Sequence, residues 1–560
     1  SGPAFQSGSL GMGEVIGIVA AAVILVLAFG SVVAMGLPIV TALFGIAIAT
    51  AGVELWSHLV ATPDFTTQVA SMIGIGVGID YALFILTRYK DALARHGDHE
   101  AAVVEAITTA GRAVLFAGAV VVVALLGMIL MRLDFVGGLA IGSSTAVAVA
   151  VAAALTLLPA LLGFAGDNVK RLSVHRRSRA DRDSLWHRWA TFLQRHPWPA
   201  AVAGTLVLVV LALPTLGMRL GFLDAGNDSA GHTTRMSYDL VAKGFGPGAN
   251  GPLFIVGELH GPSAVNRFDG LDAALGHAPG VAEVLPPVLN GSNSVGVVRV
   301  LPTTAPESAQ TVALVNHLRQ DVLPRYAGSD LSVQVGGPTA AGIDYSSVVG
   351  RRLPLFIGAV LVLSFLLLMV VFRSVLLPLK AVVMNLLSIG AAFGVMVAMY
   401  QWGWGLGLVG GGHGGPIEPW IPMMLFAIVF GLSMDYEVFL LSRIREEYDR
   451  TGDTSTAVVE GLANTGRVIT AAAAIMVTVF AGFVLGDIRA VKVIGTGLAA
   501  AVFVDAVVVR CVLVPATMEL LGQWNWWLPS WLERITPRLT VEPTAPSATR
   551  PDPEPVPLAA

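Results

Sequence analysis

Charged residues are scarce in this 560-residue chain, and cysteine is almost absent. Only 13% of the residues are charged and 55% are hydrophobic, whereas a soluble domain carries about 25% charged residues. A soluble core cannot hold so much apolar sequence, so the composition predicts a membrane protein. The single cysteine, Cys511, excludes an internal disulfide and argues against a metal–thiolate site. The small net charge of -4 gives no indication of nucleic-acid binding.

Long apolar runs are what the sequence has in abundance. A helix that crosses a bilayer needs about 20 mostly apolar residues. About eleven such runs occur, at 14–33, 37–57, 69–88, 113–131, 138–164, 198–217, 352–372, 376–401, 420–442, 468–486 and 490–521. The runs predict a mostly α-helical, polytopic membrane protein.

Lysine and arginine in the connecting segments predict the orientation of these helices. The segment 165–197 is rich in arginine and is therefore expected in the cytoplasm. Alternation from there places 89–112 and 443–467, both basic at their ends, on the same side. The stretch 218–350 and Ser1 then fall outside. An external start predicts at least one earlier crossing in the intact protein.

The stretch 218–350 differs in kind from the apolar runs. It reads as strand, helix, strand, strand, helix and strand, at 251–259, 262–277, 281–289, 295–301, 307–325 and 331–336. That order is the β-α-β-β-α-β unit, so we expect a ferredoxin-like α+β domain outside the membrane. A plain structural ectodomain is the alternative interpretation.

The two halves of the chain resemble each other. Gly-Ile-Asp-Tyr at 78–81 corresponds to Ser-Met-Asp-Tyr at 433–436, at an offset of 355 residues (435 minus 80). Ala-Val-Val-Glu at 102–105 recurs at 457–460 with the same offset. A repeat this long indicates a duplicated membrane bundle. Because Gly-Pro at 2–3 also resembles Gly-Pro at 337–338, we expect a matching outer domain before Ser1.

These patterns together predict the organisation of the chain. We expect the end of a truncated outer domain at 1–13, a first bundle of five helices at 14–164, a basic cytoplasmic linker at 165–197, a transmembrane helix at 198–217, the outer domain at 218–350, a second bundle of five helices at 351–521 and a cytoplasmic tail at 522–560. The tail opens with a tryptophan cluster typical of the membrane interface. Its Pro-rich remainder is typical of disorder.

Two aspartates, Asp80 and Asp435, lie inside apolar runs at equivalent repeat positions. A charged residue in mid-membrane costs about 2.5–3.5 kcal/mol on insertion scales, so two such residues suggest a function. Burial favours the neutral carboxyl group, which allows proton uptake and release near neutral pH. Tyr81 and Tyr436 follow directly, and neighbours on a helix point about 100° apart. Each tyrosine is therefore expected to bond to the aspartate of the other repeat. A structural hydrogen bond to a helix end is the alternative for each aspartate.

Four further residues are secondary candidates. Phe84 and Phe439 follow the two Asp-Tyr pairs at the same spacing. Asp505 and Arg510 lie in the last apolar run, where Arg510 can extend toward the membrane surface and Asp505 can pair with polar neighbours. No pattern indicates a catalytic centre, a metal ion or a cofactor, so we expect none.

The two Asp-Tyr segments carry a family resemblance. Gly-Ile-Asp-Tyr-Ala-Leu-Phe-Ile-Leu-Thr-Arg at 78–88 and Met-Asp-Tyr-Glu-Val-Phe-Leu-Leu-Ser-Arg at 434–443 resemble the MMPL family, a branch of the resistance-nodulation-division superfamily. Val-Leu-Val-Pro-Ala at 512–516 is also similar to that family's last helix. The resemblance covers nearly all of 1–521. It implies twelve helices and two outer porter domains, of which this chain would lack the first helix and the first porter domain.

The resemblance implies proton-driven export of a lipid or other hydrophobic molecule across a bacterial plasma membrane. Asp80, Tyr81, Asp435 and Tyr436 would carry the proton. The expected partners are the substrate, protons and membrane lipids, with a homo-oligomer or accessory membrane proteins also open. A proton-driven protein-translocation motor and a non-transporting sterol-sensing-like protein of the same superfamily remain alternatives. An intramembrane aspartyl protease is disfavoured, because neither aspartate stands in a Gly-x-Gly-Asp motif.

Overall fold

The computed structural model describes residues 12–29, 31–166, 180–229, 231–486 and 488–535. Residues 1–11 of the expected outer-domain end, residues 167–179 of the basic linker and the Pro-rich tail from Pro537 on therefore lie outside the described residues. Within the described residues the chain is mostly helical with one small antiparallel sheet, which confirms the predicted class of a mostly α-helical, polytopic membrane protein with a small α+β part.

The first part of the chain forms a series of long helices, with short 3₁₀ and π segments labelled η. Its elements are α1 (Met12–Phe29), α2 (Val32–Ser57), α3 (Thr66–His96), α4 (His99–Ala106), η1 (Ile107–Gly111), α5 (Arg112–Leu126), η2 (Gly127–Met131), α6 (Asp134–Ala165), α7 (Ala180–Arg195), α8 (Pro197–Ala212) and η4 (Leu213–Gly217). The second part repeats the long helices after the sheet domain. Its elements are α13 (Pro338–Phe372), α14 (Leu376–Met396), η9 (Val397–Gln401), η10 (Leu406–Val409), α15 (Trp420–Thr451), α16 (Thr454–Phe483), α17 (Arg489–Val504), η11 (Asp505–Leu513), α18 (Val514–Leu521), η12 (Gly522–Trp526) and α19 (Ser530–Ile535).

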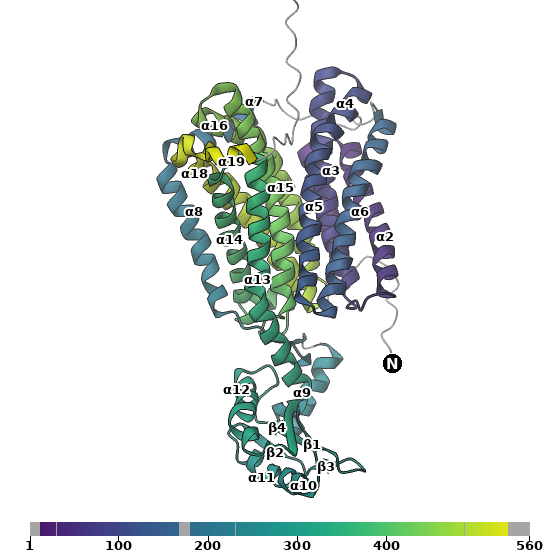
Figure 1. Cartoon of the computed structure of the whole chain (residues 1–560). Helices are drawn as coiled ribbons and strands as arrows, with labels where there is room; N and C mark the ends of the chain where they lie inside the picture. Colours follow the sequence, from purple (N-terminus) through teal and green to yellow (C-terminus); the bar gives the residue numbers. More distant parts are fainter. Residues whose placement is uncertain (1–11, 30, 167–179, 230, 487, 536–560) are drawn as a thin grey trace, which may run out of the picture.

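Ten helical stretches in the described ranges are long and apolar enough to cross a membrane. They are Val32–Ser57, Thr66–His96, His99–Met131, Asp134–Ala165, Pro197–Gly217, Pro338–Phe372, Leu376–Gln401, Trp420–Thr451, Thr454–Phe483 and Arg489–Trp526. The expected run at 14–33 forms α1, whose apolar part Val15–Leu27 is shorter. Several helices extend beyond their apolar runs. The longest, α13, begins at Pro338 because the helix continues from the membrane into the sheet domain (Figure 1).

The β-sheet domain lies at one end of the helical bundle (Figure 1). Helices α4, α7 and α19 lie at the opposite end, here called the far end. The sheet domain is built as follows. Its elements are η5 (Ala225–Asn227), α9 (Thr233–Phe245), η6 (Pro247–Asn250), β1 (Leu253–Leu259), α10 (Pro262–Asp269), α11 (Leu271–Gly276), β2 (Val281–Val284), β3 (Val288–Leu289), β4 (Val295–Pro302), α12 (Ala309–His317), η7 (Leu318–Val322), η8 (Leu323–Arg325) and β5 (Leu331–Gly336). The sheet is antiparallel with the order β2-β4-β1-β5, and β3 pairs with β4. Alternate residues of β1 and β4 are buried, as expected for strands with one face on a core.

Two helices, α3 and α15, form the interior of the bundle. In each helix, 94% of the residues in its most apolar 18-residue stretch are buried, whereas other membrane-length helices leave large faces for lipid. Small residues permit this close packing. A Cβ added at Gly431 of α15 would lie 2.6 Å from the Val121 Cγ2 of α5, and one at Gly76 of α3 would lie 2.8 Å from the Phe480 ring of α16. The residues at these contacts hold the two central helices in place.

Helix α1 packs mainly against α16 of the second half and less against α2, its neighbour in sequence. From the sequence it was assigned to the first bundle. Helix α1 packs more closely on α16 than on α2 because helices in a membrane associate by the fit of their surfaces and not by their order in the chain. The two halves are thus interlocked as well as repeated.

The sheet domain is attached to the second half at a polar junction. Asn227, which is buried, donates from its amide to the Glu307 Oε1 and to the Gly414 carbonyl, each at 3.5 Å. Arg489, the first residue of α17, donates to the carbonyl oxygens of Asn227 and His413 at 2.9 and 2.7 Å. The junction therefore links the sheet domain, the Gly-rich loop 403–415 and the membrane helix α17.

A carboxyl pair in this junction predicts a dependence on pH. Burial, a hydrogen bond with Asp224 and the negative charge of Asp224 raise the pKa of Glu307 from 4.5 to about 7. Since this pKa is raised in the folded junction, its stabilising contribution is complete below pH 4.5 and is lost as the pH rises through about 7. We expect the thermal midpoint of the wild-type protein to fall over that range.

The substitution Glu307→Gln is expected to remove most of this pH dependence, because a neutral amide can donate to Asp224 at any pH. Thermal unfolding measured across that window checks this. Glu283→Gln, at an exposed glutamate on β2, is the matched control and should keep the wild-type dependence. If the thermal midpoint of Glu307→Gln depends on pH as that of the wild type does, the pH dependence does not come from a proton that Glu307 shares with Asp224.

Candidate functional site

The four residues expected to carry a proton meet in the middle of the bundle. The Tyr81 hydroxyl donates to the Asp435 Oδ2 at 2.9 Å, and the Tyr436 hydroxyl donates to the Asp80 Oδ1 at 2.6 Å. Both aspartates lie near the midpoint of their helices, α3 and α15. The crossed arrangement predicted from helix geometry is therefore present: each tyrosine serves the aspartate of the other repeat. We call these four residues the crossed pairs.

The crossed pairs are shielded from solvent. Asp80 is 1% exposed and Asp435 is 8% exposed. Each carboxyl group also has one buried oxygen, the Asp80 Oδ2 and the Asp435 Oδ1, that no donor reaches within the described residues. An unpaired buried carboxylate oxygen is costly, whereas a proton or a water molecule removes that cost. The geometry thus suits groups that bind a proton.

The two secondary phenylalanines also come together. The rings of Phe84 and Phe439 contact edge to face, with centroids 5.0 Å apart, and Phe84 also contacts the Tyr436 ring at 5.6 Å. They lie one helical turn beyond the aspartates, toward the far end of the bundle. Both therefore border the crossed pairs with an apolar wall.

Asp505 and Arg510 form a buried ion pair beside the crossed pairs. The Arg510 Nε donates to the Asp505 Oδ2 at 2.7 Å, and the two side chains are 1% and 6% exposed. Arg510 also donates to the Ser433 carbonyl and hydroxyl, and its guanidinium lies over the Tyr436 ring, 5.4 Å from the centroid. A position near the membrane surface was expected for Arg510. It instead points inward, because a partner carboxylate satisfies its charge.

Sequence reasoning missed the residues that extend this pair into a network. Ser433 donates to the Asn385 Oδ1 at 2.7 Å and to the Asp505 Oδ1 at 2.9 Å. Glu437 is buried within reach of the charges of Arg510 and Lys380, and it bonds with Asn385. The signal was available: Glu437 directly follows an Asp-Tyr pair and lies on the same helix.

The network exists in only one half of the protein. At the offset of 355 residues, the positions of Ser433, Glu437, Asp505 and Arg510 are occupied in the first half by uncharged residues. These are Gly78, Ala82, Ala150 and Leu155, respectively. The crossed pairs are therefore symmetric under the repeat, whereas their surroundings are not.

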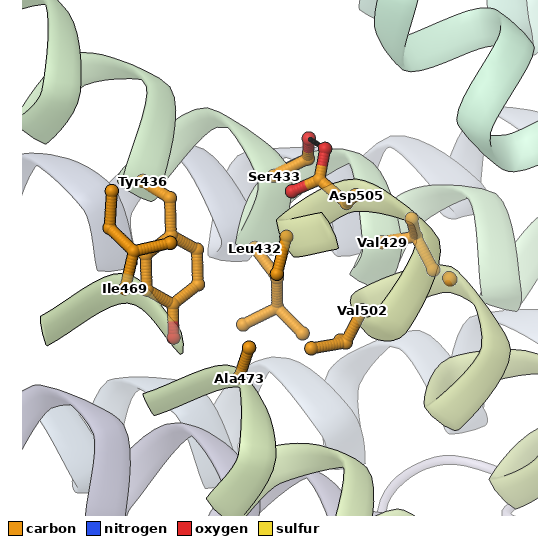
Figure 2. A pocket seen from close by; sticks show the side chains of 10 residues that line it. Val429, Leu432, Ser433, Tyr436, Ile469, Ala473, Val502 and Asp505 are labelled. Atoms are coloured by element: carbon orange, nitrogen blue, oxygen red, sulfur yellow. Dashed lines mark hydrogen bonds between the residues drawn. The ribbon is translucent and has the colours of Figure 1, made fainter. Parts of the chain in front are cut away.

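A small cavity lies between Tyr436 and the hydrogen-bonded Ser433 and Asp505 of the network. It has a volume of about 10 Å³ and is lined by Tyr436, Ser433, Asp505 and apolar residues of α15, α16 and α17. Figure 2 shows the bonded Ser433 and Asp505 on one side and Tyr436 on the other, with Leu432 between them and Ala473 and Val502 lower in the view. This volume is close to that of one water molecule.

A bundle of membrane-length helices built from two repeats around buried carboxyl groups defines a multi-pass membrane protein. The profile of the MMPL family matches residues 3–200 and 294–545, and the chain belongs to that family. The predicted resemblance is confirmed, and with it the location as a multi-pass protein of the bacterial plasma membrane.

Several characterised relatives are similar over nearly the whole chain. The mycolic acid-containing lipids exporter MmpL11 of Mycolicibacterium smegmatis is 36% identical over 94% of this chain and 56% of its own length. The membrane protein YdfJ of Bacillus subtilis is 36% identical over 95% of the chain and 73% of its own length. The heme uptake protein MmpL11 of Mycobacterium tuberculosis is 38% identical over 92% of the chain and 54% of its own length. The chain thus spans about half the length of the MmpL11 relatives.

Proposed function

We propose that the protein is a proton-driven transporter that exports a lipid or another hydrophobic molecule across the plasma membrane. The observation that carries the proposal is the pair of crossed Asp–Tyr hydrogen bonds in the middle of the bundle. Buried intramembrane carboxyl groups on facing helices are the usual means of coupling protons to transport. The name of the M. smegmatis relative, a lipid exporter, supports a lipid as the class of substrate.

The proposed mechanism assigns separate tasks to the crossed pairs and the sheet domain. A proton entering from outside binds one aspartate of the crossed pairs. When Asp435 is protonated, its carboxyl group is neutral and is no longer attracted to the positive charge of Arg510, so that α15 can shift against α3. One proton moving down 100 mV releases about 2.3 kcal/mol. Burying one methylene is worth about 0.8 kcal/mol, so exposing a whole lipid chain to water would cost far more. The substrate therefore follows an apolar route along the protein, and protons drive the return of the protein to its starting state.

Import is the second candidate for direction, because a relative of comparable identity is named a heme uptake protein. Lipid extracts from cells with and without the gene, in the form that the cell makes, separate the two. Export predicts that one lipid class accumulates in the plasma membrane and disappears from the outer layers when the gene is deleted. Unchanged lipids together with lost heme uptake would contradict export.

A further inference from the structure

A second cavity touches the crossed pairs on the side away from the sheet domain. It has a volume of about 30 Å³ and lies between α3, the start of α5 and α15. It is lined by Tyr81, Phe84, Arg88, Ala110, Ala113, Val114, Ala117, Asp435 and Phe439. We call it the far cavity.

The depth of the two cavities follows from the helices that line them. Helix α15 runs from Trp420 near the sheet domain to Thr451 at the far end. The smaller cavity is lined by α15 from Val429 to Tyr436, whereas the far cavity is lined by Asp435 and Phe439. The far cavity also follows α3 for two further turns, from Tyr81 to Arg88. The crossed pairs thus lie between one cavity toward the sheet domain and one toward the far end.

The size and the polar edge of the far cavity suit water. A water molecule needs about 10–15 Å³ of such space, so the far cavity holds about two. Most of its wall is apolar, yet Asp435 borders it and has one oxygen, Oδ1, that no donor reaches within the described residues. A buried acceptor beside a cavity of this size is satisfied by water.

The two halves of the chain differ in the residues that line the far cavity. The wall residues Ala110, Ala113 and Ala117 correspond, at the offset of 355 residues, to Thr465, Val468 and Ala472. At positions 110 and 113 the first half therefore has smaller side chains than the second half, whereas position 117 and its equivalent are both alanine. Arg88 of α3 also lines the far cavity. The asymmetry distinguishes the two aspartates, which the sequence repeat makes equivalent.

We propose that the far cavity is the outlet of the proton path and that Asp435 is the carboxyl group that releases the proton. This proposal rests on the proposed function. The Asp435 carboxyl group gives its proton to a water molecule in the cavity, which leaves a carboxylate and a hydronium ion. The hydronium ion passes its proton to the aqueous phase at the far end, which the basic segments place in the cytoplasm. The Tyr81 hydroxyl and the positive charge of Arg510 stabilise the carboxylate that remains.

Filling the cavity tests the outlet directly. In Ala117→Leu the larger side chain occupies the space beside Asp435 and should block the path. Ala119→Leu, on the exposed face of the same helix, is the matched control. The full chain in liposomes is given a rapid pH jump on one side of the membrane. The infrared band of the Asp435 carboxyl group, assigned by its loss in Asp435→Asn, reports the protonation of that residue without any substrate.

The wild-type protein and Ala119→Leu are expected to respond quickly to a pH jump on the far side. Ala117→Leu should lose this fast response. Ala113→Val, which introduces the residue of the second half, should slow it with less risk to folding, and thermal midpoints confirm that the variants are folded. A fast far-side response in a folded Ala117→Leu protein would overturn the outlet, as would a wild-type band that responds only to the sheet-domain side. Neither result bears on proton drive itself, which the asparagine variants test separately.

Discussion

Replacement of Asp80 or Asp435 by asparagine is expected to abolish export while the protein still folds and inserts. Asparagine has nearly the same shape as aspartate, and its amide oxygen can accept the tyrosine hydrogen bond that each aspartate now accepts. It cannot gain or lose a proton near neutral pH. If protons drive the transport cycle, each variant removes one necessary protonation step and leaves the packing of α3 and α15 in place.

The measurement compares substrate in the outer layers of cells that express each variant at equal levels. Asp449→Asn is the matched control, because Asp449 lies on the same helix, α15, and is exposed at the surface, where it pairs with Arg445. It should export as the wild type does. Tyr81→Phe and Tyr436→Phe should weaken export less, since a tyrosine orients the carboxyl group and does not carry the proton. Wild-type export by a folded variant with both asparagines would refute proton coupling at this site.

Replacement of Arg510 by leucine is expected to cause the largest loss of stability among single changes at the site. Arg510 and Asp505 are both buried, and removal of one partner leaves the other charge without compensation. Such a change costs about 3–5 kcal/mol. The double change Asp505→Ala with Arg510→Leu should recover most of that loss, because the first half already has Ala150 and Leu155 at the equivalent positions.

Denaturant or thermal unfolding in lipid bicelles measures both variants. Equal destabilisation of the single and the double variants would contradict the account of an uncompensated charge. The double variant then separates stability from transport. If it is folded and inactive, the ion pair tunes the crossed pairs through the contact between Arg510 and Tyr436. If it is folded and active, the pair has a structural role.

The residues that sequence reasoning missed show where it fails. Counting apolar residues finds a membrane helix, but it does not tell which face of the helix is buried. Glu437 and Lys380 lie near the ends of apolar runs, where charged residues normally face the membrane surface. The burial of Glu437 depends on Arg510, Lys380 and Asn385, which other helices supply. A network of this kind forms from partners distant in the chain, so the position of Glu437 beside an Asp-Tyr pair indicates a candidate residue but not its partners.

The sequence by itself determined the class of the protein, the repeat and the two intramembrane aspartates. Apolar length and periodicity are local properties, and a bilayer requires that each spanning segment satisfy its own backbone hydrogen bonds. Three features are determined only by the tertiary structure: Asp435 borders the far cavity, α1 packs against α16, and Arg510 points inward. These features depend on how side chains from both halves fill the space between helices. Alanine at 113 and valine at 468 are equally apolar in a sequence pattern, but only the smaller one leaves room for water.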